Sequence, residues 1–478
     1  MDPKRPIIEP ALDEPLLVVD APPVEKLPPR LWIRRRLFSN FYNSAITVVL
    51  LPLIAYLAYR GLLFLFVTAR WSPVRENLTL FMVGRYPRAE LWRIVAQLII
   101  WSSALGLAWG AAVSGARFRA AQAGLPYRED PLLAKVRRYW ALLSMLGLFL
   151  LMTQSYGPLL VTAAALAAGS LLKSLAARVP GRHNVLLWAG VGVLGVVGYQ
   201  IVSGFHGNGW LWMGAPVALG VVSLLGRVEW PSQSRWRVVR LGAVVGVFAI
   251  AYAVYALVGT PGVGWDDWEG FHLNLITATV AIVLAFPLGL LLALARRSSL
   301  PALRVMSTAY IELIRGVPLI TLLLMSQTFI GFFLDTDTPL SSLTRSIAAF
   351  TLFTAAYVAE IVRGGLQSVD RGQIEAGQSV GLSSFAVTRL IVLPLALRAV
   401  IPAMVGQFIA LFKDTSLLSI VSVADLLFVR RVVHAQEAFR AFGIAETLVF
   451  VMLAFWAVSF TMSRESQRLE RRLGIGER

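Results

Sequence analysis

Long runs without charged residues constrain this chain more than any other feature of its sequence. They occur at Val185–Trp212, Leu241–Trp265, Leu273–Ala295 and Gly316–Leu334. A helix needs roughly 20 apolar residues to cross a bilayer. Only 15% of the 478 residues are charged, whereas soluble proteins average about 25%. The runs therefore predict an all-α polytopic membrane protein.

The apolar runs and the loops between them predict about twelve spans. We place them near 43–68, 91–113, 139–172 (two spans that part at Ser155–Pro158), 185–203, 211–226, 238–258, 273–295, 308–334, 343–362, 395–412 and 445–463. Most basic loops then fall on one side, as the positive-inside rule requires, which places both termini in the cytoplasm. Loop 69–90, with its four arginines, is the exception.

A change in composition near residues 260–270 predicts a division of the chain. We expect a disordered cytoplasmic tail (1–40), an N-terminal transmembrane extension (41–260), a C-terminal core (270–465) and a cytoplasmic tail (466–478). The net charge of +17 is accounted for by the basic loops, so we expect a lipid bilayer and no nucleic acid as partner. The sequence has no phosphate-binding Gly-x-x-x-x-Gly-Lys-Ser/Thr loop, no cysteine and no metal-ligand spacing of histidines. We therefore expect no ATP hydrolysis by this chain, no metal and no other cofactor.

The most distinctive polar segment is residues 375–394, EAGQSVGLSSFAVTRLIVLP. Its pattern predicts a short helix opened by Glu375, a break at Gly381, and a second helix that ends at Leu393 and Pro394. A polar helix, a glycine and another helix are unsuited to crossing a bilayer. The segment therefore predicts a cytoplasmic projection that another protein binds.

Two acid–base pairs are expected at the cytoplasmic edge of the membrane. Glu312 and Arg315 are three residues apart, as are Glu360 and Arg363, and this spacing places each pair on one helix face. Pairing at the membrane edge lowers the cost of the charges. Both pairs are either structural anchors or relays of motion from the 375–394 segment.

Lys413, Asp414, Thr415 and Ser416 interrupt the apolar pattern, and only 14 uncharged residues separate Arg398 from Lys413. That is short for a crossing. Either the helix begins near Phe385 and tilts, or the chain bends back. The segment is expected to line a translocation path or its outer gate, with a plain outer loop as the alternative. Gln407, on the same helix, is a further candidate for substrate contact.

Residues 375–394 resemble the loop by which ABC-importer membrane subunits contact their ATPases. That pattern is Glu-Ala-Ala, three residues, Gly, nine residues, and Ile-x-Leu-Pro. Gly377 replaces the second Ala, which should loosen the helix by up to about 1 kcal/mol. The resemblance assigns coupling to six residues: Glu375, Ala376, Gly377, Gly381, Leu393 and Pro394.

Further motifs resemble the polar amino-acid branch of these importers. They are YIELIRGVPL from Tyr310, AEIVRGG from Ala359 and KDTSL from Lys413. The long N-terminal half is most similar to the larger permease of general L-amino-acid importers. The resemblance implies a five-helix type I permease core in a bacterial inner membrane.

The resemblance also implies partners. These are a dimer of cytoplasmic ATPases, a second membrane subunit and an extracytoplasmic amino-acid-binding protein. A homodimer, or an importer of another small polar solute, remains an alternative. A membrane-embedded enzyme would need convergent catalytic polar residues near one interface, and the sequence offers none.

Overall fold

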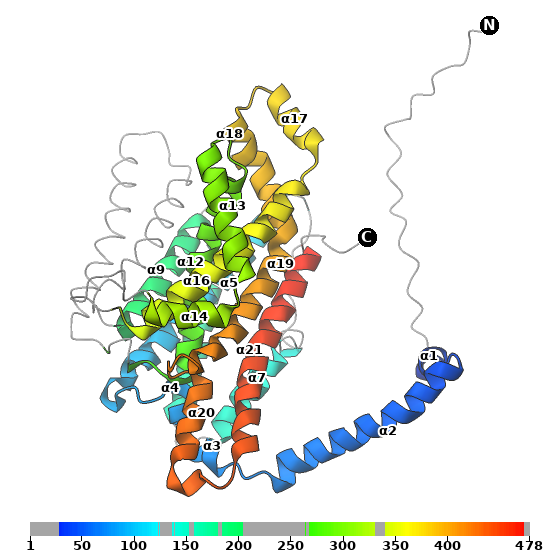
Figure 1. Cartoon of the computed structure of the whole chain (residues 1–478), viewed down its shortest axis with the longest axis vertical. Coiled ribbons are helices and arrows are strands. Elements are labelled where there is room, and N and C mark those ends of the chain that lie inside the picture. The colour runs from blue at the N-terminus through cyan, green and yellow to red at the C-terminus, as the bar shows by residue number, and fades with distance from the viewer. Residues whose placement is uncertain are drawn as a thin grey trace. The chain divides into compact units, whose positions relative to one another are not determined.

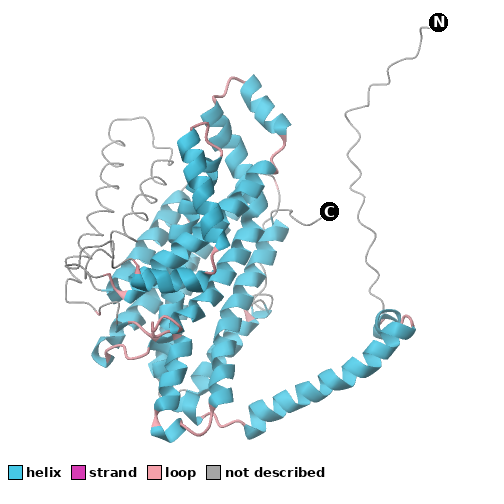
Figure 2. Cartoon of the chain, viewed as in Figure 1, coloured by secondary structure: helices cyan, strands magenta, loops and turns pink. Residues whose placement is uncertain are grey.

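The computed structural model describes residues 28–122, 124, 136–137, 139–152, 157–179, 184–203, 263, 267–329 and 340–472. This part of the chain is helical, and the only extended pairing within it is an isolated bridge between Gly270 and Asp425 (Figure 2). The predicted all-α fold is confirmed. The chain divides into two units, residues 1–69 and 70–478.

The first unit contains α1 (Pro29–Leu37), α2 (Phe41–Leu63) and the π-helix η1 (Phe64–Thr68). Asn40 caps α2 because its side chain accepts a 2.7 Å hydrogen bond from the N–H of Asn43. Together α2 and η1 form a candidate span, in agreement with the predicted span 43–68. Helix α1 lies within the predicted tail 1–40, whose first 27 residues are outside the described part.

The second unit begins with short helices that lead into a long one. In order, its first helices are α3 (Ser72–Glu76), α4 (Leu78–Val83), η2 (Arg88–Glu90), α5 (Leu91–Gln122), α7 (Trp140–Met152), α8 (Gly157–Ala176) and α9 (Asn184–Ser203). Helices α7 and α8 confirm that the 139–172 stretch is two helices. A Cβ on Gly106 of α5 would lie 2.0 Å from the carbonyl oxygen of Gly169 in α8. Glycine therefore allows close contact of these helices, as is common in membranes.

The remaining helices form the C-terminal core (Figure 1). They are α12 (Gly270–Arg296), α13 (Pro301–Gly316), α14 (Leu319–Thr328), α16 (Ser342–Gln367), α17 (Arg371–Ser379), α18 (Ser384–Val387), η5 (Thr388–Val392), α19 (Leu393–Asp414), η6 (Thr415–Ser419), α20 (Leu426–Ala435), η7 (Glu437–Phe439) and α21 (Ile444–Arg472). At its centre α12 packs closely on α16, where a Cβ on Gly289 would lie 2.8 Å from the carbonyl oxygen of the buried Ala355.

Seven helices in the described part are long and apolar enough to span a membrane, or eight if α13 and α14 count as one. The predicted total of about twelve is not reached there: spans 211–226 and 238–258 lie outside the described residues, and α7 and α9 are not among the candidate spans. Span 308–334 is not one straight helix. Helices α13 and α14 meet at 105°, because Val317 precedes Pro318 and takes an extended conformation.

The helix after Gly381 does not end at Leu393 and Pro394, contrary to the prediction. It continues as one candidate span from Ser384 to Ser419. Proline lacks an N–H, and its ring collides with the carbonyl group four residues earlier, here that of Leu390. The π-helix η5 contains Leu390 and widens the turn there, so the helix passes through Pro394. Of the two alternatives for this region, the helix that begins near Phe385 is confirmed.

Candidate coupling loop and membrane-edge ion cluster

The loop between α16 and η5 is built from capped helical turns. The Asp370 side chain caps α17 by accepting a 2.6 Å hydrogen bond from the N–H of Gly372. Helix α17 therefore begins at Arg371, and the prediction that Glu375 opens it is wrong. The break at Gly381 is confirmed. Its φ of +83° suits glycine, and its N–H donates to the carbonyl of Gln378 at 2.9 Å.

The buried Gly377 holds α17 against the following helix. A Cβ at this position would lie 2.7 Å from Cδ1 of Ile391 and 3.1 Å from a methyl carbon of Val387. The departure from Ala in the resemblance is thus compensated by packing. Among the other predicted coupling residues, Glu375, Ala376, Gly381 and Pro394 are exposed, and Leu393 is partly buried.

The loop also presents apolar side chains outward. Val380 is 76% exposed, Phe385 is 74% exposed and Leu390 is 62% exposed. Large apolar side chains on an exposed projection are typical of a protein-binding surface. Val380, which precedes the candidate span that begins at Ser384, and Phe385 at its start form an exposed apolar surface suited to binding a partner protein.

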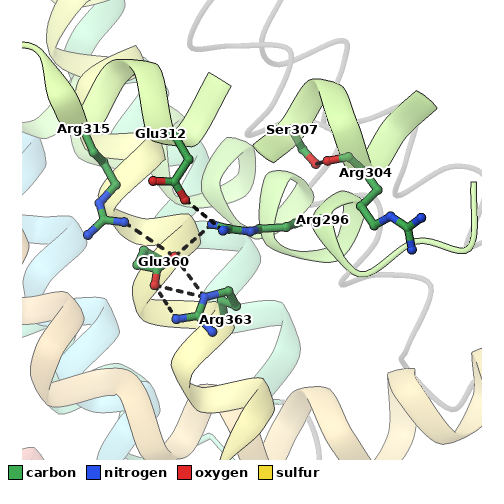
Figure 3. Close-up of polar contacts among 7 residues, drawn as sticks. All are labelled: Arg296, Arg304, Ser307, Glu312, Arg315, Glu360 and Arg363. Carbon is green, nitrogen blue, oxygen red and sulfur yellow. Dashed lines mark hydrogen bonds and ion pairs between the residues drawn. The ribbon is translucent and has the colours of Figure 1, made fainter. Parts of the chain in front are cut away.

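Five charged side chains join α12, α13 and α16 at the C-terminal end of α12 (Figure 3). Arg296 of α12 contacts Glu312 of α13 at 2.9 Å and Glu360 of α16 at 3.2 Å. Glu360 also pairs with Arg315 at 3.7 Å and with Arg363. The predicted Glu360–Arg363 pair is confirmed. The predicted Glu312–Arg315 pair is wrong, because the fold brings each residue to a partner on another helix.

At the opposite end of α12, a buried amide joins three segments. Nδ2 of Asn274 donates to Oγ1 of Thr415 at 3.0 Å and to Oδ2 of Asp425 at 3.3 Å. Oδ1 of Asn274 accepts from the N–H of Leu426 at 3.0 Å, and Asp425 caps α20 through the N–H of Phe428. The side chains of Asn274, Thr415 and Asp425 are completely buried. We call these three residues the outer polar knot.

The residues predicted to line the path differ in their exposure and contacts. Lys413 is exposed and lines a cavity of about 440 Å³ beside Phe455 and Trp456, between α19 and α21. Asp414, Ser416 and Gln407 are partly buried, and Thr415 belongs to the outer polar knot. Thr415 and Ser416 form a 3-10 turn that continues α19.

Comparison with known proteins agrees with this geometry. Residues 285–475 match the family model described as binding-protein-dependent transport system inner membrane component. The permease YhdY of Escherichia coli, described as an inner membrane amino-acid ABC transporter permease, is 38% identical over 52% of this chain and 74% of its own length. The permease BztC of Rhodobacter capsulatus is 33% identical over 94% of this chain and 95% of its own length. The chain belongs to this family of inner-membrane permeases.

A solved structure is also similar to this permease. The chain of a crystal structure described as an amino acid ABC transporter with histidines is 28% identical, with 42% of this chain and 92% of that chain covered. The TM-score is 0.39. Family membership makes this permease a multi-pass transport subunit of the inner membrane and not an enzyme, with the ATPase in a separate chain and a further membrane subunit as partner.

Three residues at these two sites were not predicted from the sequence. Arg296 directly follows the predicted span 273–295 and was not singled out, although it joins Glu312 to Glu360. Asn274 and Asp425 were not singled out either. Asn274 carried a usable signal, because a polar side chain inside an apolar run needs a partner. Asp425 lies in a connecting segment, where nothing in the sequence pattern shows its burial.

Proposed function

We propose that this permease is the transmembrane subunit of an ATP-driven amino-acid importer, coupled to its ATPase through residues 371–392. The exposed apolar surface of Val380, Phe385 and Leu390 is the observation that carries the proposal. Gly377 fixes this surface to η5, so a push on α17 is transmitted to α19 as a rigid-body motion. In this arrangement the loop and both termini are cytoplasmic.

The substrate class is supported by the relatives. BztC, which aligns over 464 residues, is named as a permease of a glutamate, glutamine, aspartate and asparagine transport system. We propose a substrate range of polar L-amino acids, delivered by an extracytoplasmic binding protein. A different permease chain as second membrane subunit is preferred to a homodimer, and co-purification of the tagged permease distinguishes them.

The direct test is reconstitution into liposomes with an ATPase, a second permease and a binding protein of the same organism. ATP-dependent accumulation of a labelled polar amino acid, competed by unlabelled L-amino acids, is expected. Accumulation of another solute with no competition by amino acids would show that the substrate class is wrong.

Coupling is tested by substitutions in the same liposomes. Val380→Asp with Phe385→Asp places charges on the proposed docking surface, and Glu375→Lys reverses the exposed acid on α17. Both variants should lose uptake and stimulated ATP hydrolysis. Phe385→Leu keeps an apolar side chain and serves as the matched control, which should retain both activities. Normal coupling in the charged variants would argue against docking at this loop.

The path is proposed to pass beside Lys413, Asp414, Ser416 and Gln407. A cysteine at Ser416 should react with a small maleimide, because this position is partly exposed. A cysteine at Thr415 should react only when ATP opens the outer polar knot, because Thr415 is buried there. Equal reactivity at both positions with and without ATP would place the path elsewhere.

A further inference from the structure

Residues 70–90 form a clasp over the outer end of the core. Three polar ties hold it. Arg85 donates to Glu269 from its backbone N–H and from Nε, each at 2.8 Å. The N–H of Arg70 donates to Oε1 of Glu446 at 2.7 Å, and Gln436 donates to Oδ1 of Asn77 at 2.9 Å. We call residues 70–90 the clasp.

Apolar packing makes the clasp a fixed part of the core. Val74, Leu78 and Phe81 are buried in one cluster with residues of α20 and α21, and the rings of Phe81 and Phe450 are 5.2 Å apart. The clasp also lies close to the start of α12. A Cβ on Gly270, at the start of α12, would lie 2.7 Å from the carbonyl oxygen of Phe81. This end of α12, α20 and α21 is therefore already covered by the chain's own residues.

The clasp lies on the opposite side of the membrane from the coupling loop. Helix α12 has 27 residues, or about 40 Å at 1.5 Å per residue, and it joins the clasp at Gly270 to the ion cluster at Arg296. Figure 1 shows α17 and α18 at one end of this unit and α3 and α20 at the other. A cytoplasmic coupling loop thus makes the clasp extracytoplasmic.

The clasp packs on the part of α21 that extends past the start of α12. The ring of Phe455 contacts that of Phe271 in the first turn of α12, with centroids 6.3 Å apart. Helix α21 begins at Ile444, 11 residues before Phe455, so it continues about 16 Å past this level. The clasp packs on that extension through Glu446 and Phe450. Because Arg70 contacts Glu446 near the first residue of this candidate span, the clasp lies at the end of the span, where a soluble protein can reach it.

The charge of the clasp is unusual for its position. It contains four arginines and two glutamates, although Lys and Arg are normally depleted from extracytoplasmic loops. Arg75 and Arg88 are exposed, and the Arg85 side chain is 76% exposed even though it binds Glu269. The basic groups face outward while apolar groups hold the clasp in place.

We propose that the clasp is the surface of this subunit on which the extracytoplasmic binding protein docks, through an acidic face of that protein. This inference rests on the proposed function. Because the clasp covers the ends of α12, α20 and α21, a protein that approaches this part of the subunit meets arginines of the N-terminal region. Complementary charge at a docking surface accelerates encounter and fixes orientation.

The test measures ATP hydrolysis by the whole transporter in nanodiscs against the concentration of its binding protein. In Arg75→Glu with Arg88→Glu, the half-maximal concentration should rise about tenfold or more, with unchanged basal hydrolysis and melting temperature. Arg75→Ala with Arg88→Ala should show a smaller rise. Glu76→Gln, which removes a neighbouring exposed negative charge, is the matched control and should not raise the half-maximal concentration.

The other outcomes separate the alternatives. A wild-type curve in the doubly reversed variant overturns the docking role. The docking role is also overturned if the variant responds normally to the binding protein and loses only a dependence of ATP hydrolysis on anionic lipid. That result would mean that the wild-type arginines bind lipid headgroups. If the wild-type transporter itself does not respond to the binding protein, the proposed function fails, and the docking role fails with it.

Discussion

Glu360 is the residue on which the ion cluster depends. It accepts hydrogen bonds from Arg296 and Arg363 and forms an ion pair with Arg315, whereas Glu312 pairs with Arg296. Glu360→Gln should therefore destabilise the transporter by about 2 kcal/mol. Glu312→Gln should cost less than about 1 kcal/mol because Glu312 is largely exposed. Thermal unfolding in detergent measures both, and equal losses would contradict this hierarchy.

The outer polar knot should be sensitive to pH. Burial raises the pKa of Asp425 from 3.8 to about 6, against hydrogen bonds from Phe428 and Asn274 that favour the charged form. The folded state thus prefers the protonated acid. The stability that protonated Asp425 contributes is fully present below pH 4 and is lost as the pH rises through 6.

Asp425→Asn keeps a capping side chain and removes the titration. Between pH 4 and 7 the wild type should lose stability relative to this variant by on the order of 2 kcal/mol. Melting temperatures of both proteins across this range test the prediction. A difference that stays constant with pH would show that Asp425 does not titrate there.

At the scale of elements, the bend at Gly381 should control coupling through the backbone alone. Its φ is +83°, and nothing lies within 4 Å of a Cβ placed there. Gly381→Val should strain the turn by about 1–2 kcal/mol and reduce stimulated ATP hydrolysis. Gly381→Asn should be nearly normal, because asparagine tolerates this conformation. Equal activity of the two variants would contradict the backbone explanation.

The elements that the sequence predicts well are those with a local signal. Apolar runs predict the helices of the core, and Gly381 marks a real break. The end of the second loop helix was predicted wrongly because Pro394 usually stops a helix, and a π-turn is invisible in a sequence pattern. Glu312 and Arg315 satisfy the helical spacing, yet their partners come from α12 and α16, and such long-range contacts have no local signature.

At the scale of the whole molecule, part of the positive charge of loop 69–90 has a tertiary cause. Arg85 follows from packing, since it compensates the buried Glu269 of the core. Replacing Ser72–Val83 by a Gly-Ser linker of equal length should destabilise the core by several kcal/mol, because Val74, Leu78 and Phe81 lose their burial.

A linker that replaces Trp32–Arg36 of α1, in the other unit, is the control for this experiment. It should have a much smaller effect on the melting temperature of the purified transporter. Similar losses from both replacements would mean that the clasp is not part of the core.

The orientation and partner of the coupling loop are tested most directly by one cysteine at Val380, because the chain has no cysteine of its own. In the assembled transporter this residue should cross-link to the ATPase subunit and should resist a membrane-impermeant maleimide added outside intact cells. Labelling from outside, or an assembled transporter in which no cross-link to the ATPase forms, would contradict the account.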